Sequence, residues 1–175
     1  MYSTAPLYAI LAARPLDLAH LPGIERRAAR LLEDHAPLSV LAETTNDEDF
    51  RAAQVEGRLW VAVAGDEPVG FALVEMLDDG LPHLEEIDVD PAHRRRGLGT
   101  LLVRAVCEWT VERSYAELTL TTQRAVPFNM PFYAKLGFAV VPDAEQRPAL
   151  VEVVREEASR GLHPAARCVM RWRPR

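Results

Sequence analysis

A basic, glycine-rich turn is the stretch of this chain whose residue types point most directly to chemistry. It reads Arg94-Arg95-Arg96-Gly97-Leu98-Gly99-Thr100, and the residues after it carry apolar side chains at helical spacing. The turn therefore opens a helix, whose first N–H groups lack partners and carry the positive end of the helix dipole. Glycine lets an anion approach the backbone closely, and arginine adds charge-assisted donors. The pattern predicts a cradle for a di- or triphosphate.

Two common phosphate-binding motifs do not fit these residues. The string Gly-x-x-x-x-Gly-Lys-Ser/Thr of the nucleoside triphosphatases does not occur in the chain. The dinucleotide fingerprint Gly-x-Gly-x-x-Gly would need a glycine or alanine where Leu102 stands. What remains is Arg94-x-x-Gly97-x-Gly99 between a strand-like run and a helix.

A second motif, Asn129-Met130-Pro131-Phe132-Tyr133-Ala134-Lys135-Leu136-Gly137-Phe138, lies downstream. Together the two motifs resemble the GNAT superfamily of N-acetyltransferases. That family has an Arg-x-x-Gly-x-Gly loop for the pyrophosphate of acyl-CoA and a late helix ending in Phe/Leu-Tyr-x-Lys-x-Gly-Phe. The resemblance is strong over residues 59–141 and loose elsewhere.

The resemblance implies acetyl transfer from acetyl-CoA to a primary amine, by direct attack in a ternary complex. The backbone of residues 87–89 would pair with the pantetheine amides, and the turn would hold the pyrophosphate. Within the turn, the side chain of Arg95 or Arg96 would reach the 3′-phosphate of CoA, or it would face water. The implied acetyl-CoA contacts are Ile87, Asp88, Val89, Arg94, Arg95, Arg96, Gly97, Leu98, Gly99, Thr100, Asn129 and Tyr133.

Amide formation requires loss of a proton from the amine, stabilisation of the thioester oxygen and protonation of the leaving thiolate. The resemblance makes Tyr133 the general acid, and a backbone N–H near Val89 the oxyanion donor. Glu85 is the expected base, acting through water. His83 is the alternative, because it shares a strand face with Glu85 and titrates near neutral pH; an unassisted reaction is the third possibility. Glu86 is expected on the opposite face.

Asn129 marks a departure from the family pattern. Many members have an asparagine seven residues before the tyrosine, and Val126 stands there in this chain. Asn129 could contact the same region of CoA from a neighbouring direction. It could equally hydrogen-bond the local backbone at a helix start.

The elements that position these residues can be read from the spacing of apolar residues and from turn signals. We expect a mixed, mainly antiparallel sheet of about seven strands flanked by helices, an α+β (α/β/α) architecture, with an extra helix before the last strand. Asp17 is a candidate N-cap for a helix to about residue 33 that Pro22-Gly23 breaks or kinks. The expected strands are 7–13, 59–64, 69–76, 83–89, 116–121, 138–141 and 167–173, and the expected helices are 17–33, 46–54, 98–113, 127–136 and 144–160.

The composition limits the classes of protein to which this chain could belong. The chain has 175 residues, 49% hydrophobic and 26% charged, which fits one domain over residues 1–175. A net charge of −6 argues against a nucleic-acid partner. Cys107 and Cys168 make no disulfide framework, and Cys107 is expected to be a buried small hydrophobe. No signal peptide, no apolar run of ~18 residues and no histidine ligand spacing are evident, so we expect a cytoplasmic protein without a membrane span or a metal.

The acceptor is left open by the sequence. An acidic segment would suit a cationic small-molecule or peptide amine, or it is an ordinary solvated surface; it contains Glu33, Asp34, Glu43, Asp47, Glu48 and Asp49. A homodimer through the last strands is plausible from the resemblance. The alternatives to an enzyme are a non-catalytic acyl-CoA-binding or sensor module and a nucleotide- or nucleic-acid-binding protein. The acidic net charge and the failed nucleotide motifs argue against the latter.

Overall fold

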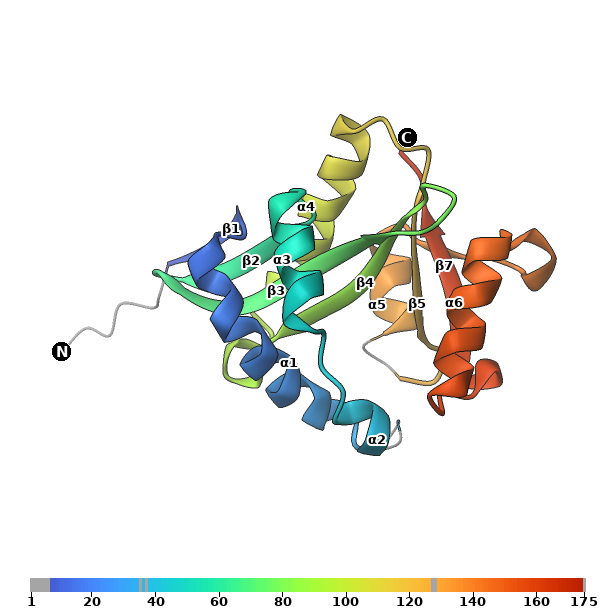
Figure 1. Cartoon of the computed structure of the whole chain (residues 1–175), viewed down its shortest axis with the longest axis horizontal. Coiled ribbons are helices and arrows are strands. Elements are labelled where there is room, and N and C mark those ends of the chain that lie inside the picture. Colours follow the sequence, from blue (N-terminus) through green and yellow to red (C-terminus); the bar gives the residue numbers. More distant parts are fainter. Residues whose placement is uncertain (1–6, 35, 37, 127–128, 175) are drawn as a thin grey trace.

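The computed structural model of the chain describes residues 7–34, 36, 38–126 and 129–174 (Figure 1). Within these residues, seven strands form one mixed sheet in the order β1-β2-β3-β4-β5-β7-β6. Neighbouring strands are antiparallel except β4 and β5, which confirms the predicted sheet. The strands are β1 (Tyr8–Ala12), β2 (Leu59–Ala64), β3 (Glu67–Met76), β4 (Pro82–Val89), β5 (Leu118–Gln123), β6 (Ala139–Val140) and β7 (Arg167–Trp172).

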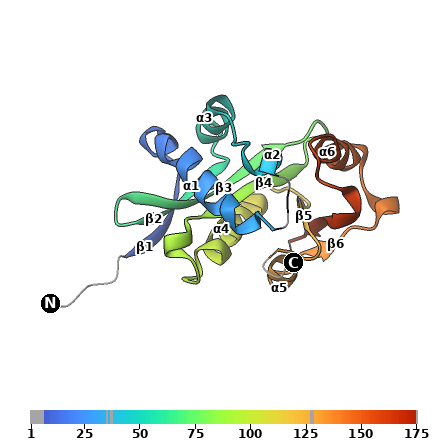
Figure 2. The ribbon, with the colours of Figure 1, turned by 90° about the horizontal axis from the view of Figure 1, so that it is seen from below.

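Helices cover both faces of the sheet. Viewed from below, α1, α3 and α6 lie on one side, and α5 lies on the other (Figure 2). Strand alternation sorts the core accordingly: Val61 and Phe71 pack toward α1 and α3, whereas Ala62 and Ala72 pack toward α4. The helices are α1 (Leu21–Ala29), α2 (Leu38–Leu41), α3 (Asp47–Val55), α4 (Leu98–Glu112), α5 (Met130–Lys135) and α6 (Pro148–Ser159). The α6 helix is the expected extra helix before the last strand.

The N-terminal helical region differs from the prediction. A 3-10 helix, Pro15–His20, precedes α1, and Arg14 rather than Asp17 is its N-cap. Asp17 lies inside the first turn, where its buried carboxylate accepts hydrogen bonds from the Arg14 backbone and guanidinium. Pro22 lies in the first turn of α1 and starts that helix instead of breaking it, because a missing N–H costs nothing there.

Two further boundaries differ from expectation. Residues 38–41 form the short helix α2, which is not among the expected helices. The start of the predicted helix 127–136 lies outside the described residues, and α5 begins at Met130. Both cysteines are free and buried, as expected for Cys107, and burial raises the pKa of its thiol to about 12.

The β4 strand carries the irregularity that shapes the site. Leu73 pairs with Glu86 and Val74 pairs with Leu84, so Glu85 is an extra residue on β4, a β-bulge. The one register pair between β4 and β5 in the described residues is His83–Thr119. Residues 84–89 therefore have no strand partner on that side, and the two central strands diverge toward the start of α4.

Candidate active site

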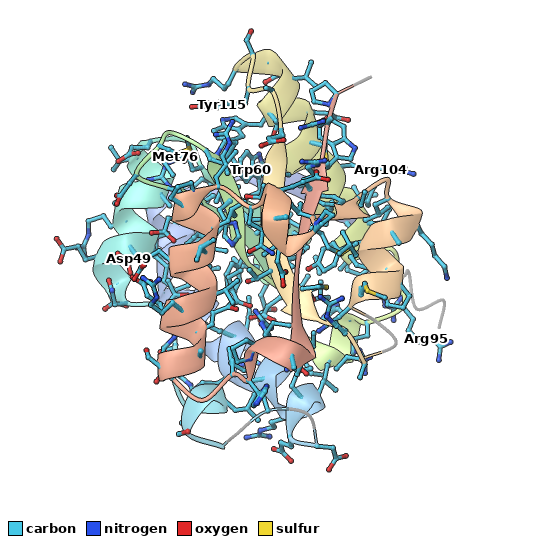
Figure 3. All side chains as sticks on the ribbon, turned by 90° about the vertical axis from the view of Figure 1, so that its right-hand side faces the viewer. Asp49, Trp60, Met76, Arg95, Arg104 and Tyr115 are labelled. Atoms are coloured by element: carbon cyan, nitrogen blue, oxygen red, sulfur yellow. The ribbon has the colours of Figure 1, made fainter. Side chains whose placement is uncertain are left out.

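A cavity of about 1200 Å³ connects the two sides of the molecule where β4 and β5 diverge. Asp49 and Met76 line it on one side of the protein, and Arg95 lines it on the other (Figure 3). Its floor comes from β3, β4 and β5, and its walls come from α1, α3, α5, α6 and the start of α4. In the described part of the chain, no helix is long and apolar enough to cross a membrane, and no group of acidic, histidine or cysteine side chains could hold a metal ion.

The basic turn forms one end of this cavity. Gly97 is the N-cap of α4 and has a φ of 78°, and a Cβ there would touch nothing, so the backbone conformation alone calls for glycine. The first-turn amides of α4 face no helical partner. The cavity lining includes Arg94, Arg95, Gly97, Leu98, Gly99 and Thr100, so these predicted residues lie together.

Arg96 behaves differently from its neighbours. Its side chain is not part of the cavity lining, and its guanidinium lies over the Tyr8 ring, 5.6 Å from the ring centroid. Of the two arginines considered for the 3′-phosphate, Arg95 is therefore the one at the cavity, and its side chain extends outward at the edge of the molecule (Figure 3).

Carboxylates on β4 form the opposite end. The bulge breaks strict alternation, so Glu85 and Glu86 line the same cavity; the expectation that Glu86 faces the other side of the sheet is wrong. Glu85 is open to cavity water yet surrounded by protein, and burial, followed by the charges of Glu75 and Glu157, raises its pKa to about 7. Glu85 is therefore poised to gain and lose a proton near neutral pH.

His83, the alternative base, lies elsewhere. It is buried and absent from the cavity lining, and its Nδ1 lies 2.9 Å from Oγ1 of Thr119. Burial lowers its pKa to about 4, so it is neutral at pH 7. The geometry brings Glu85, and not His83, to the cavity.

A second carboxyl cluster involves α1. Glu86 and Asp88 are close enough to share a hydrogen bond, and burial with the nearby Glu25 raises the pKa of both. Glu25 is buried on α1 and accepts hydrogen bonds from the Thr45 backbone N–H and hydroxyl at 2.9 and 3.2 Å. Sequence reasoning missed Glu25. The signal was a charged residue one turn after Leu21, on the apolar face of the helix.

Tyr133 and Asn129 line the cavity from α5. The Tyr133 ring is buried edge-on against Phe132 and Phe138, and its hydroxyl has no hydrogen-bond partner among the described residues. Burial raises its pKa, and the charges of Glu86 and Asp88 raise it further. Asn129 occupies the N-cap position of α5 without a side-chain cap bond, so the local hydrogen bond considered for it is not formed.

The α6 helix supplies a wall that the motifs did not predict. Glu157 of α6 forms a 2.6 Å ion pair with Arg167 of β7, and Thr121 of β5 hydrogen-bonds both side chains. Nearby, Arg160 and Glu43 form a 3.5 Å ion pair between α6 and the segment before α3. Of the predicted acidic segment, Glu43 and Asp49 reach the cavity; Glu33, Asp34, Asp47 and Glu48 do not.

Comparison with known proteins agrees with this geometry. The family model described as "Acetyltransferase (GNAT) family" matches residues 26–138, well over half of the chain. The chain belongs to the acetyltransferase (GNAT) family. The match includes β2 to α5, and so covers the bulged strand, the basic turn and Tyr133.

Named relatives of this GNAT-family chain are N-acetyltransferases. It is 36% identical over 56 residues to glucosamine 6-phosphate N-acetyltransferase of Trypanosoma brucei brucei, covering 32% of the chain and 36% of that protein. It is 33% identical over 86 residues to human N-acetyltransferase 8, covering 45% of the chain and 37% of that protein. The chain thus matches little more than a third of the length of these relatives.

Solved structures agree on the GNAT fold over almost the whole chain. The PaiA N-acetyltransferase of Thermoplasma acidophilum, in complex with coenzyme A, has a TM-score of 0.73 at 15% identity, covering 96% of this chain and 99% of that one. The ribosomal-protein-S18-alanine N-acetyltransferase of Escherichia coli has a TM-score of 0.65 at 20% identity, covering 95% and 94%. These likenesses confirm the predicted acyl-CoA fold.

Proposed function

We propose that this GNAT-family acetyltransferase transfers an acetyl group from acetyl-CoA to a cationic primary amine. The observation that carries the proposal is that Glu85 and Tyr133 line the same cavity as the Arg94-x-x-Gly97-x-Gly99 turn. A proton acceptor, a proton donor and a phosphate cradle thus share one space. The activities of the named relatives support the reaction type, and the coenzyme A held by the Thermoplasma acidophilum neighbour supports the donor.

The donor binds by main-chain contacts in this proposal. The amides at the start of α4 hold the pyrophosphate, with the Arg94 side chain beside them. The pantetheine lies where β4 and β5 diverge, and its amides pair with the backbone of residues 87–89 as an added strand would. Asn129 lines the same part of the cavity and contacts the donor.

Glu85 is the base. An acceptor enters as an ammonium, which cannot attack, and a carboxylate with a pKa of about 7 can take its proton at neutral pH, directly or through water. The freed amine attacks the thioester carbon, and the oxygen gains negative charge within reach of the backbone N–H of Val89.

Tyr133 completes the reaction. Its raised pKa keeps the hydroxyl protonated, so it donates a hydrogen bond, and finally the proton, to the leaving sulfur. The charges of Glu86 and Asp88 oppose that transfer in the empty cavity. The amine nitrogen becomes positively charged as it bonds to the thioester carbon, and this charge offsets that of the two carboxylates and makes the phenol a better acid.

The charge of the cavity favours a cationic acceptor. No arginine or lysine in the described part of the chain forms an ion pair with Glu25, Glu85, Glu86 or Asp88. The arginines on the same side are already paired with glutamates, as in Arg58–Glu56, Arg160–Glu43 and Arg167–Glu157. The raised pKa of Glu86 and of Asp88 favours their neutral forms in the empty cavity, and a bound ammonium would favour their ionised forms, which an acceptor bearing a phosphate would not do.

Ligand stabilisation followed by turnover tests the proposal. Thermal unfolding with acetyl-CoA, CoA, ATP and NAD comes first, since a ligand at about 100 times its dissociation constant adds about 2.7 kcal/mol to stability. Stabilisation by the two CoA species alone is expected. Diamines, a peptide with a free N-terminus, glucosamine and glucosamine 6-phosphate are then screened by thiol release, and the amines that carry no phosphate should turn over fastest.

Two outcomes would redirect the proposal. CoA binding without turnover of any amine would support the alternative, a non-catalytic acyl-CoA sensor. A preference for glucosamine 6-phosphate over glucosamine would contradict the charge argument and leave the reaction class standing.

A further inference from the structure

The first strand contacts the phosphate end of the cavity through a tyrosine–histidine pair. The hydroxyl oxygen of Tyr8, on β1, lies 3.0 Å from Nδ1 of His93, although the two residues are 85 positions apart in sequence. Their rings meet edge-on, with centroids 5.8 Å apart. His93 immediately precedes Arg94 and lines the cavity, and neither Tyr8 nor His93 belongs to the motif that defines the turn.

Asp90 holds the backbone just before His93. His93 ends a 3-10 helix, Pro91–His93, which Asp90 caps by accepting from the Ala92 N–H at 2.9 Å. The same carboxylate accepts from Arg27 of α1 at 2.7 Å. With both its backbone and its Nδ1 fixed, the imidazole has one remaining polar atom, Nε2.

The direction of the hydrogen bond between Tyr8 and Nδ1 decides what Nε2 can do. When the phenol donates its O–H to Nδ1, a neutral imidazole carries its hydrogen on Nε2 and is a donor there. An anion next to the ring favours that tautomer. The arrangement parallels a metal-binding histidine, whose outer hydrogen bond sets the ring orientation and tautomer.

Arg96 packs against Tyr8, the other member of the pair. Its guanidinium lies over the Tyr8 ring, so the arginine that does not reach the cavity packs against the residue that holds His93. The pair therefore adds the His93 ring to the basic turn as a further donor at the cavity.

We propose that His93 donates a hydrogen bond from Nε2 to a phosphate of the acyl donor and that Tyr8 is its positioning residue. The recognised group is a phosphate, either the pyrophosphate or the 3′-phosphate of CoA. This inference rests on the proposed use of acetyl-CoA, and it adds a contact to the donor site that the turn and the helix start do not supply.

Calorimetric titration of CoA and 3′-dephospho-CoA into the full chain tests the proposal. His93→Ala should weaken CoA binding by about tenfold, because a hydrogen bond to a charged group is lost. Tyr8→Phe keeps the ring and its contact with Arg96, and should weaken binding by about threefold. His93→Gln keeps an N–H donor and should recover most of the loss. In turnover, KM for acetyl-CoA should rise in Tyr8→Phe while kcat stays the same.

The remaining comparisons separate a positioning role of Tyr8 from a general loss of structure. Tyr8→Phe/His93→Ala should bind no more weakly than His93→Ala alone, since Tyr8 acts through His93. Tyr115→Phe, the same chemical change against Trp109 in the core, is the matched control and should bind CoA normally. A penalty that disappears with 3′-dephospho-CoA assigns the 3′-phosphate, and one that persists assigns the pyrophosphate.

Specific results would overturn the inference. Unchanged CoA affinity in His93→Ala, or additive losses in the double variant, would refute the pairing. Wild-type protein that binds neither CoA species would instead refute the proposed function, so the two failures are distinguishable.

Discussion

Glu157 of α6 and Arg167 of β7 form an ion pair 2.6 Å long whose side chains are only 7% and 13% exposed. Thr121 of β5 hydrogen-bonds both of them, so the contact joins the helix α6 to the strands β5 and β7. Because both side chains also line the cavity, this contact links the C-terminal part of the fold to the cavity wall.

Loss of one partner of that pair should destabilise the protein strongly. Glu157→Ala leaves the Arg167 guanidinium buried without a counter-charge, so the free energy of unfolding should fall by about 3 kcal/mol. Chemical denaturation measures this. Glu152→Ala breaks an exposed ion pair with Arg155 on the same helix and should cost under about 1 kcal/mol. If Glu157→Leu/Arg167→Met is as unstable as Glu157→Ala, an unpaired charge is not the cause.

Glu85→Gln should remove a pH dependence as well as activity. The wild-type kcat/KM for the amine should rise with pH and level off above about 7, where Glu85 is ionised and can take a proton. The glutamine cannot accept it, so the rate should fall by about a hundredfold and the step near pH 7 should vanish. Initial rates of thiol release across the neutral range measure both. An unchanged step in Glu85→Gln would assign it to another group.

Glu85 should also make stability depend on pH. Its folded-state pKa, about 7, lies above the ordinary 4.5, so the folded protein holds this proton more tightly than the unfolded chain. The contribution to stability is present below pH 4.5 and is lost as the pH rises through about 7. Above that range, Glu85→Gln should be more stable than wild type by about 1 kcal/mol, allowing for solvent at the side chain. Thermal unfolding should show the advantage fading in acid; an advantage that persists there would contradict the assignment.

Gly97→Ala and Gly65→Ala separate backbone strain from donor binding. Both glycines have positive φ, 78° and 65°, and a Cβ on either would touch nothing. Each substitution should therefore cost about 1 kcal/mol of stability. Only Gly97 starts the helix that we propose to hold the phosphates, so only Gly97→Ala should also raise KM for acetyl-CoA. Equal effects on KM would mean that the turn does not bind the donor.

The parts of this protein that could be predicted are those determined by residues close together in the sequence. The spacing of apolar residues after Gly97 sets the register of α4, because it reflects burial of one helix face. A short, continuous apolar run before a turn marks residues 59–64 as a strand. Arg94-x-x-Gly97-x-Gly99 predicted a loop at a helix start, which the structure places at the cavity, because the loop and the helix start are contiguous in the chain.

The carboxylate end of the cavity, which we propose as the acceptor side, could not be predicted because it depends on contacts between distant residues. The bulge that turns Glu85 and Glu86 toward one cavity depends on how β4 pairs with β3, and strict alternation gave the wrong face for Glu86. Glu157 meets Arg167 only because β7 inserts between β5 and β6. Asp17, chosen as an N-cap from its type, instead accepts hydrogen bonds from both the backbone and the side chain of Arg14.

Tyr133→Phe should lower kcat while leaving the fold and the donor site intact. The hydroxyl has no partner among the described residues, so its removal leaves no buried group unsatisfied, and stability should change by less than about 0.5 kcal/mol. The edge-on contacts with Phe132 and Phe138 remain, so α5 keeps its place and KM for acetyl-CoA should hold. The leaving thiolate loses its proton donor, and kcat should fall by about tenfold to a hundredfold. Steady-state rates with calorimetric CoA affinity measure the two effects separately, and full activity in a well-folded Tyr133→Phe would mean that water or another side chain protonates the sulfur.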